Sequence, residues 1–265
     1  MKTANLALSV LLCLFTIVSA TVQAQEKPMG QLYAIHEDVV YPSKVQHYEE
    51  TAKNLANLFR EHQIGSMSYT TANTMDFTYI YITPLKSLAD VEKMDMAFAE
   101  LQDKIGDEAF EEAMGAFSDC YDSHRNYMVR MRSDLSYKPE YGNNPNDGMN
   151  YRSWEFYHVY PGKEAQMEEM AMKWKNLYTK HNIAEGYRIY LGDMGTEMPL
   201  LIVVQSAKNA VDHATKSEKI MKTLGEEGES LWYETMAMVR KIEQKTGMIR
   251  PDLSYTSGQL VTVEE

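Results

Sequence analysis

The stretch Val159-Tyr160-Pro161-Gly162-Lys163 decides the fold, because the chain contains nearly the same stretch earlier, as Val40-Tyr41-Pro42-Ser43-Lys44. The two prolines are 119 residues apart (161 − 42), and the same offset holds without a gap through the residues that follow, so that His62 corresponds to His181. Solenoid repeats are shorter, about 20 to 50 residues. A repeat of 119 residues therefore indicates two copies of a whole domain.

Both copies end on the same phrase, which we call the closing phrase: Arg132-Ser133-Asp134-Leu135-Ser136-Tyr137 and Arg250-Pro251-Asp252-Leu253-Ser254-Tyr255. In each copy an arginine stands two residues before an aspartate. Residues at i and i+2 share one face of a strand, so the two side chains can meet. The pattern fits either a structural Arg–Asp pair or an anion-binding site.

The second copy shows its elements more clearly. Trp154, Phe156, His158 and Tyr160 alternate with other residues, and such alternation predicts a strand with two different faces. Apolar residues then recur at spacings of three and four over residues 167–178, which is typical of an amphipathic helix. The first copy repeats this helical stripe at the same offset.

The remaining pattern completes each copy. We predict second strands over 66–71 and 187–191 and third strands over 77–83 and 200–205. Helical regions follow over 87–124 and 209–244, and Gly106 and Gly225 interrupt them. The last strands are predicted over 127–133 and 247–251. The order β-α-β-β-α-β is the ferredoxin-like unit, which leaves one sheet face to be covered. We therefore predict an α+β protein in which two tandem ferredoxin-like units pack as an intramolecular, pseudo-dimeric α/β barrel.

The chain divides into five segments. A positive residue, an apolar run and small residues before Gln25 predict a cleaved signal peptide over 1–24, and hence a periplasmic or secreted protein. The units are expected at 31–137 and 151–257, with a linker at 138–150, rich in turn-forming residues, and a tail at 258–265.

The composition of the chain limits the classes of partner that it can bind. The formal net charge of −12 argues against nucleic acid and anionic membranes, and after the signal no apolar run is long enough to span a bilayer. Loss of Cys13 with the signal leaves Cys120 alone, so no internal disulfide can form. No metal-binding spacing and no phosphate loop are present. We expect a small-molecule ligand, no metal, and leave a homodimer open.

With its unit order and the Tyr160-Pro161-Gly162-Lys163 turn, the chain resembles the dimeric α/β-barrel superfamily, and within it the NIPSNAP-like and antibiotic-biosynthesis-monooxygenase-like branches. The resemblance covers most of the chain twice. It implies two sheets packed face to face and a ligand either inside the barrel or between sheet and helices. Members include cofactor-free oxygenases, isomerases and haem-degrading enzymes, and the resemblance transfers no catalytic residue.

Two groups of residues are candidates for a ligand site. The strand residues Trp154, His158 and Tyr160, with Arg188 and Tyr190 on the next strand, could hold a planar anionic ligand, and the alternative is a packed aromatic core. The paired histidines His62 and His181 end the first helix of each copy, where a histidine can be a ligand or simply cap the helix. We expect the site to be asymmetric and to lie in the second copy.

Three functions stay open. The first is binding or transformation of a small organic molecule without a cofactor, as in an oxygenase or isomerase. The second is a non-catalytic ligand-binding or stress-related module. The third is haem binding through an inward histidine.

Overall fold

The structure is a computed structural model that describes residues 30–144 and 147–258. The predicted signal peptide and the end of the tail lie outside these residues. The α-helices are α1 (Val45–Glu61), α2 (Val91–Ile105), α3 (Asp107–Gly115), α4 (Glu164–Lys180) and α5 (Ala210–Met236). The strands are β1 (Gln31–Val40), β2 (Thr70–Thr74), β3 (Thr78–Leu85), β4 (Tyr121–Met131), β5 (Tyr151–Val159), β6 (Tyr187–Gly192), β7 (Leu200–Ala207) and β8 (Val239–Ile249).

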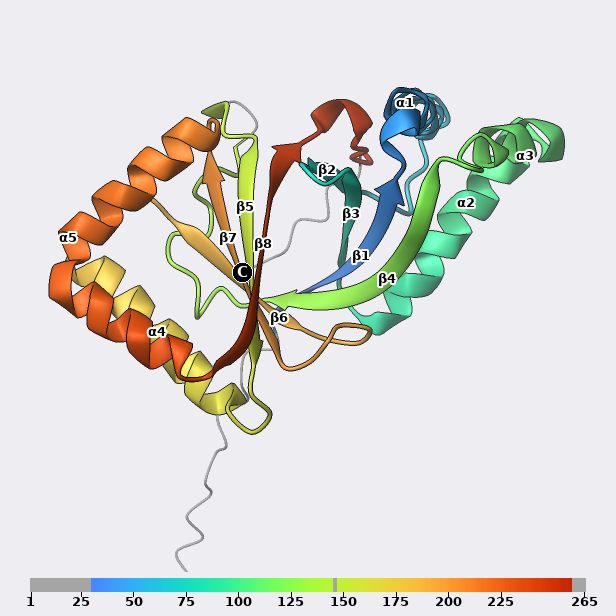
Figure 1. Cartoon of the computed structure of the whole chain (residues 1–265). Helices are drawn as coiled ribbons and strands as arrows, with labels where there is room; N and C mark the ends of the chain where they lie inside the picture. The colour runs from blue at the N-terminus through green and yellow to red at the C-terminus, as the bar shows by residue number, and fades with distance from the viewer. Residues whose placement is uncertain (1–29, 145–146, 259–265) are drawn as a thin grey trace, which may run out of the picture.

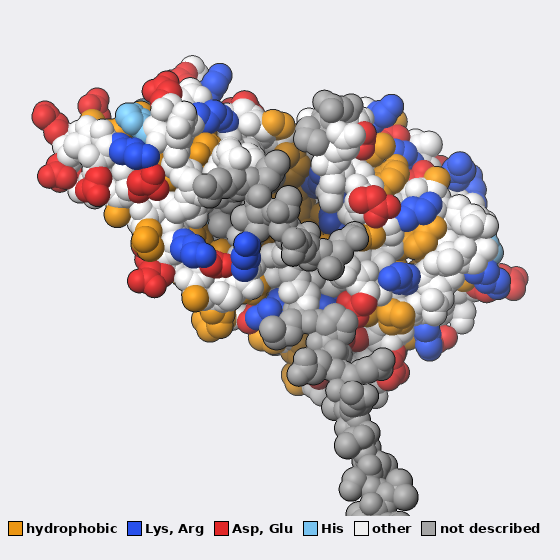
Figure 2. Space-filling model, turned by 180° about the vertical axis from the view of Figure 1, so that it is seen from behind, with side chains coloured by type: hydrophobic (Ala, Val, Ile, Leu, Met, Phe, Trp, Pro, Cys, Tyr) orange, Lys and Arg blue, Asp and Glu red, His pale blue; other side chains and the backbone are white. Residues whose placement is uncertain are grey.

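The eight strands close into one antiparallel barrel in the order β1-β3-β2-β8-β5-β7-β6-β4. Strands β1–β4 with α1–α3 form what we call the N-terminal half, and β5–β8 with α4 and α5 form the C-terminal half. Each half contributes its strands in the same order, and pairings β2–β8 and β4–β6 join the halves. The helices of the two halves cover opposite sides of the barrel (Figure 1), and charges of both signs are scattered over the face shown in Figure 2.

Strand alternation separates two environments. Trp154 pairs with Val204 and Phe156 with Ile202, and these side chains meet Ile35 of the N-terminal half inside the barrel. The alternate residues, such as Tyr157 on β5, pack beneath α4 and α5. Apolar residues of both halves therefore line the barrel interior together, while each half has further core under its own helices.

The closing phrases cross between the halves. Arg132 donates to both carboxylate oxygens of Asp134 at 2.8 and 2.7 Å, and also to Glu168 on α4 of the other half at 3.0 Å. Arg250 likewise joins Asp252 to Glu49 on α1 of the opposite half. The predicted Arg–Asp pairs are thus present, and each arginine links the two halves.

The hydrophobic residue of each closing phrase also changes sides. Leu135 packs into the core beneath α4 and α5, and Leu253 packs into the core beneath α1. The final tyrosines follow the same exchange, because the Tyr137 hydroxyl donates to the carbonyl of Ile183 and the Tyr255 hydroxyl to that of Ile64. Each half therefore completes the core of the other.

Several predicted boundaries are wrong. The second strand of the N-terminal half is Thr70–Thr74 rather than 66–71, because Tyr69 instead forms a bridge with Tyr255 of the closing phrase. The helical regions end at Gly115 and Met236 and give way to β4 and β8 by 121 and 239, earlier than predicted. The first parts of these two strands are exposed and polar, so they lack the apolar alternation that would have identified them.

The glycine interruptions are confirmed. Gly106 separates α2 from α3, and Gly225 kinks α5; both have positive φ, at 86° and 53°. Glycine adopts this conformation without the steric cost that a side chain would impose.

Candidate functional site

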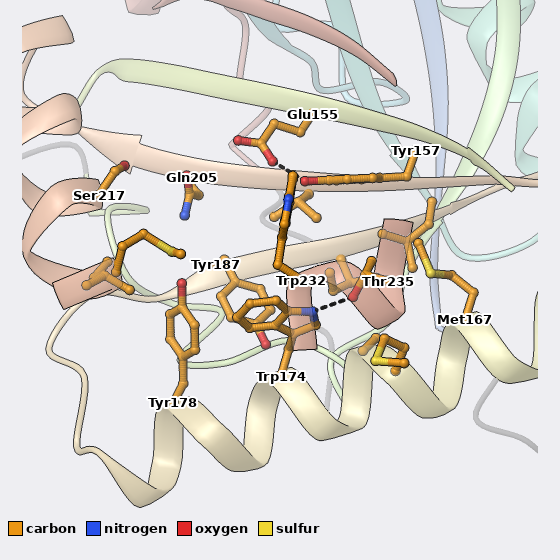
Figure 3. A pocket seen from close by; sticks show the side chains of 17 residues that line it. Glu155, Tyr157, Met167, Trp174, Tyr178, Tyr187, Gln205, Ser217, Trp232 and Thr235 are labelled. Carbon is orange, nitrogen blue, oxygen red and sulfur yellow. Dashed lines mark hydrogen bonds between the residues drawn. The ribbon is translucent and has the colours of Figure 1, made fainter. Parts of the chain in front are cut away.

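The structure contains two cavities of interest. The first, which we call the sheet–helix pocket, lies in the C-terminal half between β5–β7 and helices α4 and α5, and has a volume of about 280 Å³. In Figure 3, Trp174 and Tyr178 project from α4 toward the sheet, and Trp232 stands on α5. The walls are mostly apolar, with polar groups from Glu155, Tyr157, Tyr178, Tyr187, Gln205, Ser217 and Thr235.

Three residue differences open this pocket. In the N-terminal half the corresponding space holds Tyr48, Tyr79 and Tyr81, where Tyr48 donates to Asp38 at 2.5 Å and meets the Tyr81 hydroxyl at 2.9 Å. The helix offset of 119 residues places Met167 where Tyr48 stands, and the strand pairing places Leu201 and Val203 where Tyr79 and Tyr81 stand. The smaller side chains at these three positions leave space between sheet and helix, even though Tyr157 and Trp174 are larger than Asp38 and Leu55 at the same offset.

A carboxylate forms part of the wall. The Tyr157 hydroxyl donates to Glu155 at 2.5 Å, and burial, reinforced by Glu155, raises the pKa of this phenol far above its ordinary value. Tyr157 therefore stays protonated and holds Glu155 in place. Glu155 is only partly buried, so its other oxygen can reach a molecule in the pocket.

Other polar groups surround the ligand space. The Tyr187 hydroxyl is buried and has no hydrogen-bond partner among the described residues. Trp174 donates to Thr235 at 3.0 Å. Gln205 is held by a 3.0 Å hydrogen bond to His213, and burial lowers the pKa of that imidazole, which keeps it neutral at pH 7. Buried polar groups are nearly always hydrogen-bonded, so the Tyr187 hydroxyl is available to donate to a molecule bound in the pocket.

The second cavity, which we call the barrel lumen, lies inside the barrel and has a volume of about 620 Å³. Apolar side chains of both halves line it, including Ile35, Ile80, Trp154 and Phe156. Its polar end carries three arginines: Arg60, Arg152 and Arg188. Within the part of the chain that the structure describes, no aspartate or glutamate lines this cavity.

The structure brings together some of the predicted site residues. Trp154, Arg188 and Tyr190 line the barrel lumen together. His158 faces the same side of the sheet but lies beyond Phe156, buried, and its ring nitrogens are 3.8 Å from Glu197 and 3.7 Å from Glu243. Tyr160 lies after the end of β5 and is half exposed.

The paired histidines lie apart from both cavities. His62 and His181 are the C-cap residues of α1 and α4, and each donates its backbone N–H to a leucine carbonyl one turn earlier. The ring of His181 is 3.7 Å from Glu227. Their placement fits the helix-capping alternative.

Sequence reasoning missed the sheet–helix pocket. Glu155 and Tyr157 lie on the strand face opposite to that of the predicted site residues Trp154 and His158, and the sequence around Gln205 and Tyr187 has the pattern of ordinary strands. A signal was available: Tyr79 and Tyr81 in the N-terminal half against the smaller Leu201 and Val203 in the other. It could be used only once the strand register was known.

No group of three or more metal-binding side chains occurs within residues 30–144 and 147–258. No helix in those ranges is long and apolar enough to cross a membrane. The free thiol of Cys120 is buried, and burial raises its pKa, so it is not a reactive nucleophile.

Comparison with known proteins identifies the fold. No protein-family model and no curated protein matches the chain. Among solved structures, an anthrone oxidase-like protein is similar with a TM-score of 0.58 and 12% identity, over 89% of this chain and 97% of that one. A protein assigned as a monooxygenase from Lactobacillus acidophilus NCFM is similar with a TM-score of 0.52 and 10% identity, over 86% and 97%.

A further protein assigned as a monooxygenase, from Fusobacterium nucleatum, gives a TM-score of 0.52 at 11% identity, over 84% of this chain and 93% of that one. At such identities the similarity establishes the ferredoxin-like α/β-barrel architecture that the sequence resemblance implied. It does not establish an activity.

Proposed function

We propose that the sheet–helix pocket of the C-terminal half binds a small, mostly apolar aromatic molecule, and that the protein transforms it without a cofactor, as an oxygenase or isomerase does. The observation that carries this proposal is the opening of the pocket beside Glu155, while three tyrosines fill the equivalent space of the other half. Aromatic and apolar walls with a few polar groups are typical of small-molecule sites.

The geometry assigns a role to the main polar groups. Glu155 acts as a general base that removes a proton from a carbon or hydroxyl of the bound molecule, and Tyr157 holds it in position. The free Tyr187 hydroxyl donates a hydrogen bond to a carbonyl or phenolic oxygen of the ligand, where negative charge develops on proton removal. The resulting anion either reacts with O₂ or is reprotonated at another carbon. The likeness to oxygenase structures is compatible with this chemistry and supports only the fold.

Binding and turnover can be measured separately. Two of the three tryptophans, Trp174 and Trp232, line the pocket, so their fluorescence reports occupancy. We expect uncharged bicyclic phenols and aromatic ketones, tested first with 1-naphthol, to change this fluorescence saturably. An oxygen electrode and product analysis then detect O₂ uptake or isomerisation.

The variant Glu155→Gln separates the alternatives. A base role predicts that Glu155→Gln retains ligand binding and loses turnover. Ligand binding without turnover in the native protein would instead favour the non-catalytic module. Absence of any pocket ligand in a broad screen would refute the proposal as a whole.

A haem role finds less support. No histidine lines the sheet–helix pocket or the barrel lumen among the described residues, so neither offers an imidazole as axial ligand. Titration with haem while the Soret band is followed tests this hypothesis directly.

We also propose that the two halves are tandem copies of one ancestral unit, so that a single chain reproduces a dimeric barrel of the NIPSNAP-like or antibiotic-biosynthesis-monooxygenase-like kind. The shared strand order, the 119-residue offset and the exchanged closing phrases support this origin. We further propose that the protein acts outside the cytoplasm, on the evidence of the predicted signal peptide. N-terminal sequencing of the exported protein tests that proposal.

A further inference from the structure

The barrel lumen concentrates positive charge in an acidic protein. The whole chain carries a formal net charge of −12, yet the polar end of the lumen presents Arg60, Arg152 and Arg188 and, among the described residues, no carboxylate. Arg152 and Arg188 are only 7% and 6% exposed. Buried charges are normally paired, because moving an ion from water into a protein interior costs roughly several kcal/mol.

Neutral groups hold both guanidinium groups in place. Arg152 donates to the backbone carbonyls of Met149, Tyr151 and Gly142, the last at 2.8 Å. Arg188 donates to carbonyls of the linker between the halves, to the Asn143 side chain and, at 2.9 Å, to the Ser206 hydroxyl. These bonds orient the two groups but do not neutralise them.

The two charges repel each other. Burial, followed by the proximity of Arg188, lowers the pKa of Arg152 to about 10, so that Arg152 is still protonated at pH 7. The nearest acid on the lumen face of β1, Glu37, is already bound by Arg125 and Tyr127 at 2.7 and 2.6 Å. An anion entering the lumen would therefore relieve repulsion that no described residue relieves.

The remaining walls of the lumen favour a ligand whose uncharged part is apolar. Beyond the arginines the walls are apolar, from Trp154 and Phe156 to Ile202 and Val204. Two phenols flank the charged end: Tyr33 and Tyr190 meet edge to face at 5.8 Å, and burial raises the pKa of both, that of Tyr33 to about 12. They stay protonated and can donate hydrogen bonds to an anion.

We infer that the barrel lumen is a second binding site, separate from the sheet–helix pocket, and that it takes a small carboxylic acid with an apolar body. The carboxylate lies between Arg152 and Arg188, and the apolar body lies along the wall that includes Trp154. A planar carboxylate suits guanidinium groups that already use most of their N–H donors, whereas a phosphate would need more donors. The volume of about 620 Å³ is in the range of ligand pockets.

The positions of the tryptophans allow ligand binding in the barrel lumen to be measured separately by fluorescence. The chain has three tryptophans, and only Trp154 lines the lumen. In the double variant Trp174→Phe with Trp232→Phe, fluorescence therefore reports the lumen alone. We expect sodium decanoate to change it saturably, and decanol, the matched uncharged ligand, to bind at least about tenfold more weakly, the size of one good charge-assisted contact.

A second measurement does not depend on any arginine variant. In NMR titrations of decanoate labelled with ¹³C at the carboxyl group, the bound acid should stay ionised to a pH about one unit lower than the free acid, because the arginines favour its anion. Arginines that only fasten the linker would leave this titration unchanged.

The variant Arg188→Gln should weaken decanoate binding at least about tenfold and leave decanol binding unchanged. Arg130→Gln is the matched control, since Arg130 pairs with Asp193 at 2.5 Å and does not line the lumen. Circular dichroism verifies that both variants fold. If Arg188→Gln does not fold, the comparison of decanoate with decanol and the ¹³C titration decide.

An unchanged ¹³C titration would overturn the inference, and so would three further results. One is equal affinity for decanol and decanoate, and another is displacement of decanoate by millimolar inorganic phosphate. The third is decanoate binding that appears only after removal of residues 259–265, because Glu264 and Glu265 of the chain itself would then be the natural carboxylates of the site. None of these outcomes bears on the sheet–helix pocket, whose ligands are read through Trp174 and Trp232.

Discussion

The two cross-half arginines allow a matched test of how burial sets the strength of an ion pair. The closing phrases place Arg132 and Arg250 in equivalent clusters, each with an aspartate two residues later and a glutamate from the opposite half. The Arg132 side chain is 6% exposed and that of Arg250 is 20% exposed. We predict that Arg132→Gln destabilises the protein more than Arg250→Gln.

The expected sizes follow from these exposures. Breaking a fully buried pair costs about 3 to 5 kcal/mol, and an exposed pair contributes about 0 to 1 kcal/mol. Asp134 is a third exposed and Glu168 only 15%, so water can replace part of the lost contact, and we expect about 2 to 3 kcal/mol for Arg132→Gln. Asp252 is 45% exposed and Glu49 is 28% exposed, so about 1 kcal/mol is expected for Arg250→Gln.

Urea denaturation monitored by circular dichroism measures both values, since urea, unlike guanidinium chloride, does not screen charges. The slope of free energy against urea should stay the same in both variants, with only the midpoint moving. An Arg250→Gln variant that is destabilised as much as Arg132→Gln would refute the reasoning from burial. If the single unfolding transition of the native protein becomes two transitions in a variant, these arginines also couple the unfolding of the two halves.

Further predictions concern the barrel seam, the pocket and pH. A side chain on Gly247 would lie 1.9 Å from the carbonyl oxygen of Asn73 on the neighbouring strand, so Gly247→Ala should lower stability by about 1 to 3 kcal/mol in thermal unfolding. Val203→Tyr should fill the sheet–helix pocket and reduce 1-naphthol binding at least about tenfold, measured by fluorescence, with the fold intact by circular dichroism. Hydrogen bonds from the neighbouring arginines lower the pKa of Asp134 and Asp252, so their stabilisation is complete above about pH 5 and is lost as the pH falls below about 4, through the folded pKa values; urea midpoints from pH 7 to pH 3 check this.

The sequence predicted the order of elements because that order depends on local patterns. The alternation along residues 154–160 and the helical stripe over 167–178 are periodicities that tertiary contacts do not alter. The starts of β4 and β8 depend instead on pairing with β1 and β5, and their exposed polar residues carry no apolar period. Their boundaries could therefore not be found from local pattern.

The cavities depend on which strand face meets which neighbour. Strand spacing predicted that Arg188 and Tyr190 share one face, and in the structure both line the barrel lumen with Trp154. It could not show that Arg152 stands beside Arg188, because the pairing of β5 with β7 and β6 with β7 brings them together. The sequence also could not predict that the closing phrases link the two halves, since Glu49 and Glu168 are far from their arginines in sequence.

The exchange of closing phrases has a consequence for synthesis on the ribosome. The N-terminal half is made first, but its core beneath α1 includes Leu253, and Tyr255 packs against Phe59 at 5.4 Å between ring centroids. Those residues are translated more than a hundred positions after β4, so the core of the first half lacks them while the second half is being made. The native core of the N-terminal half can therefore be completed only after the C-terminal half has been synthesised.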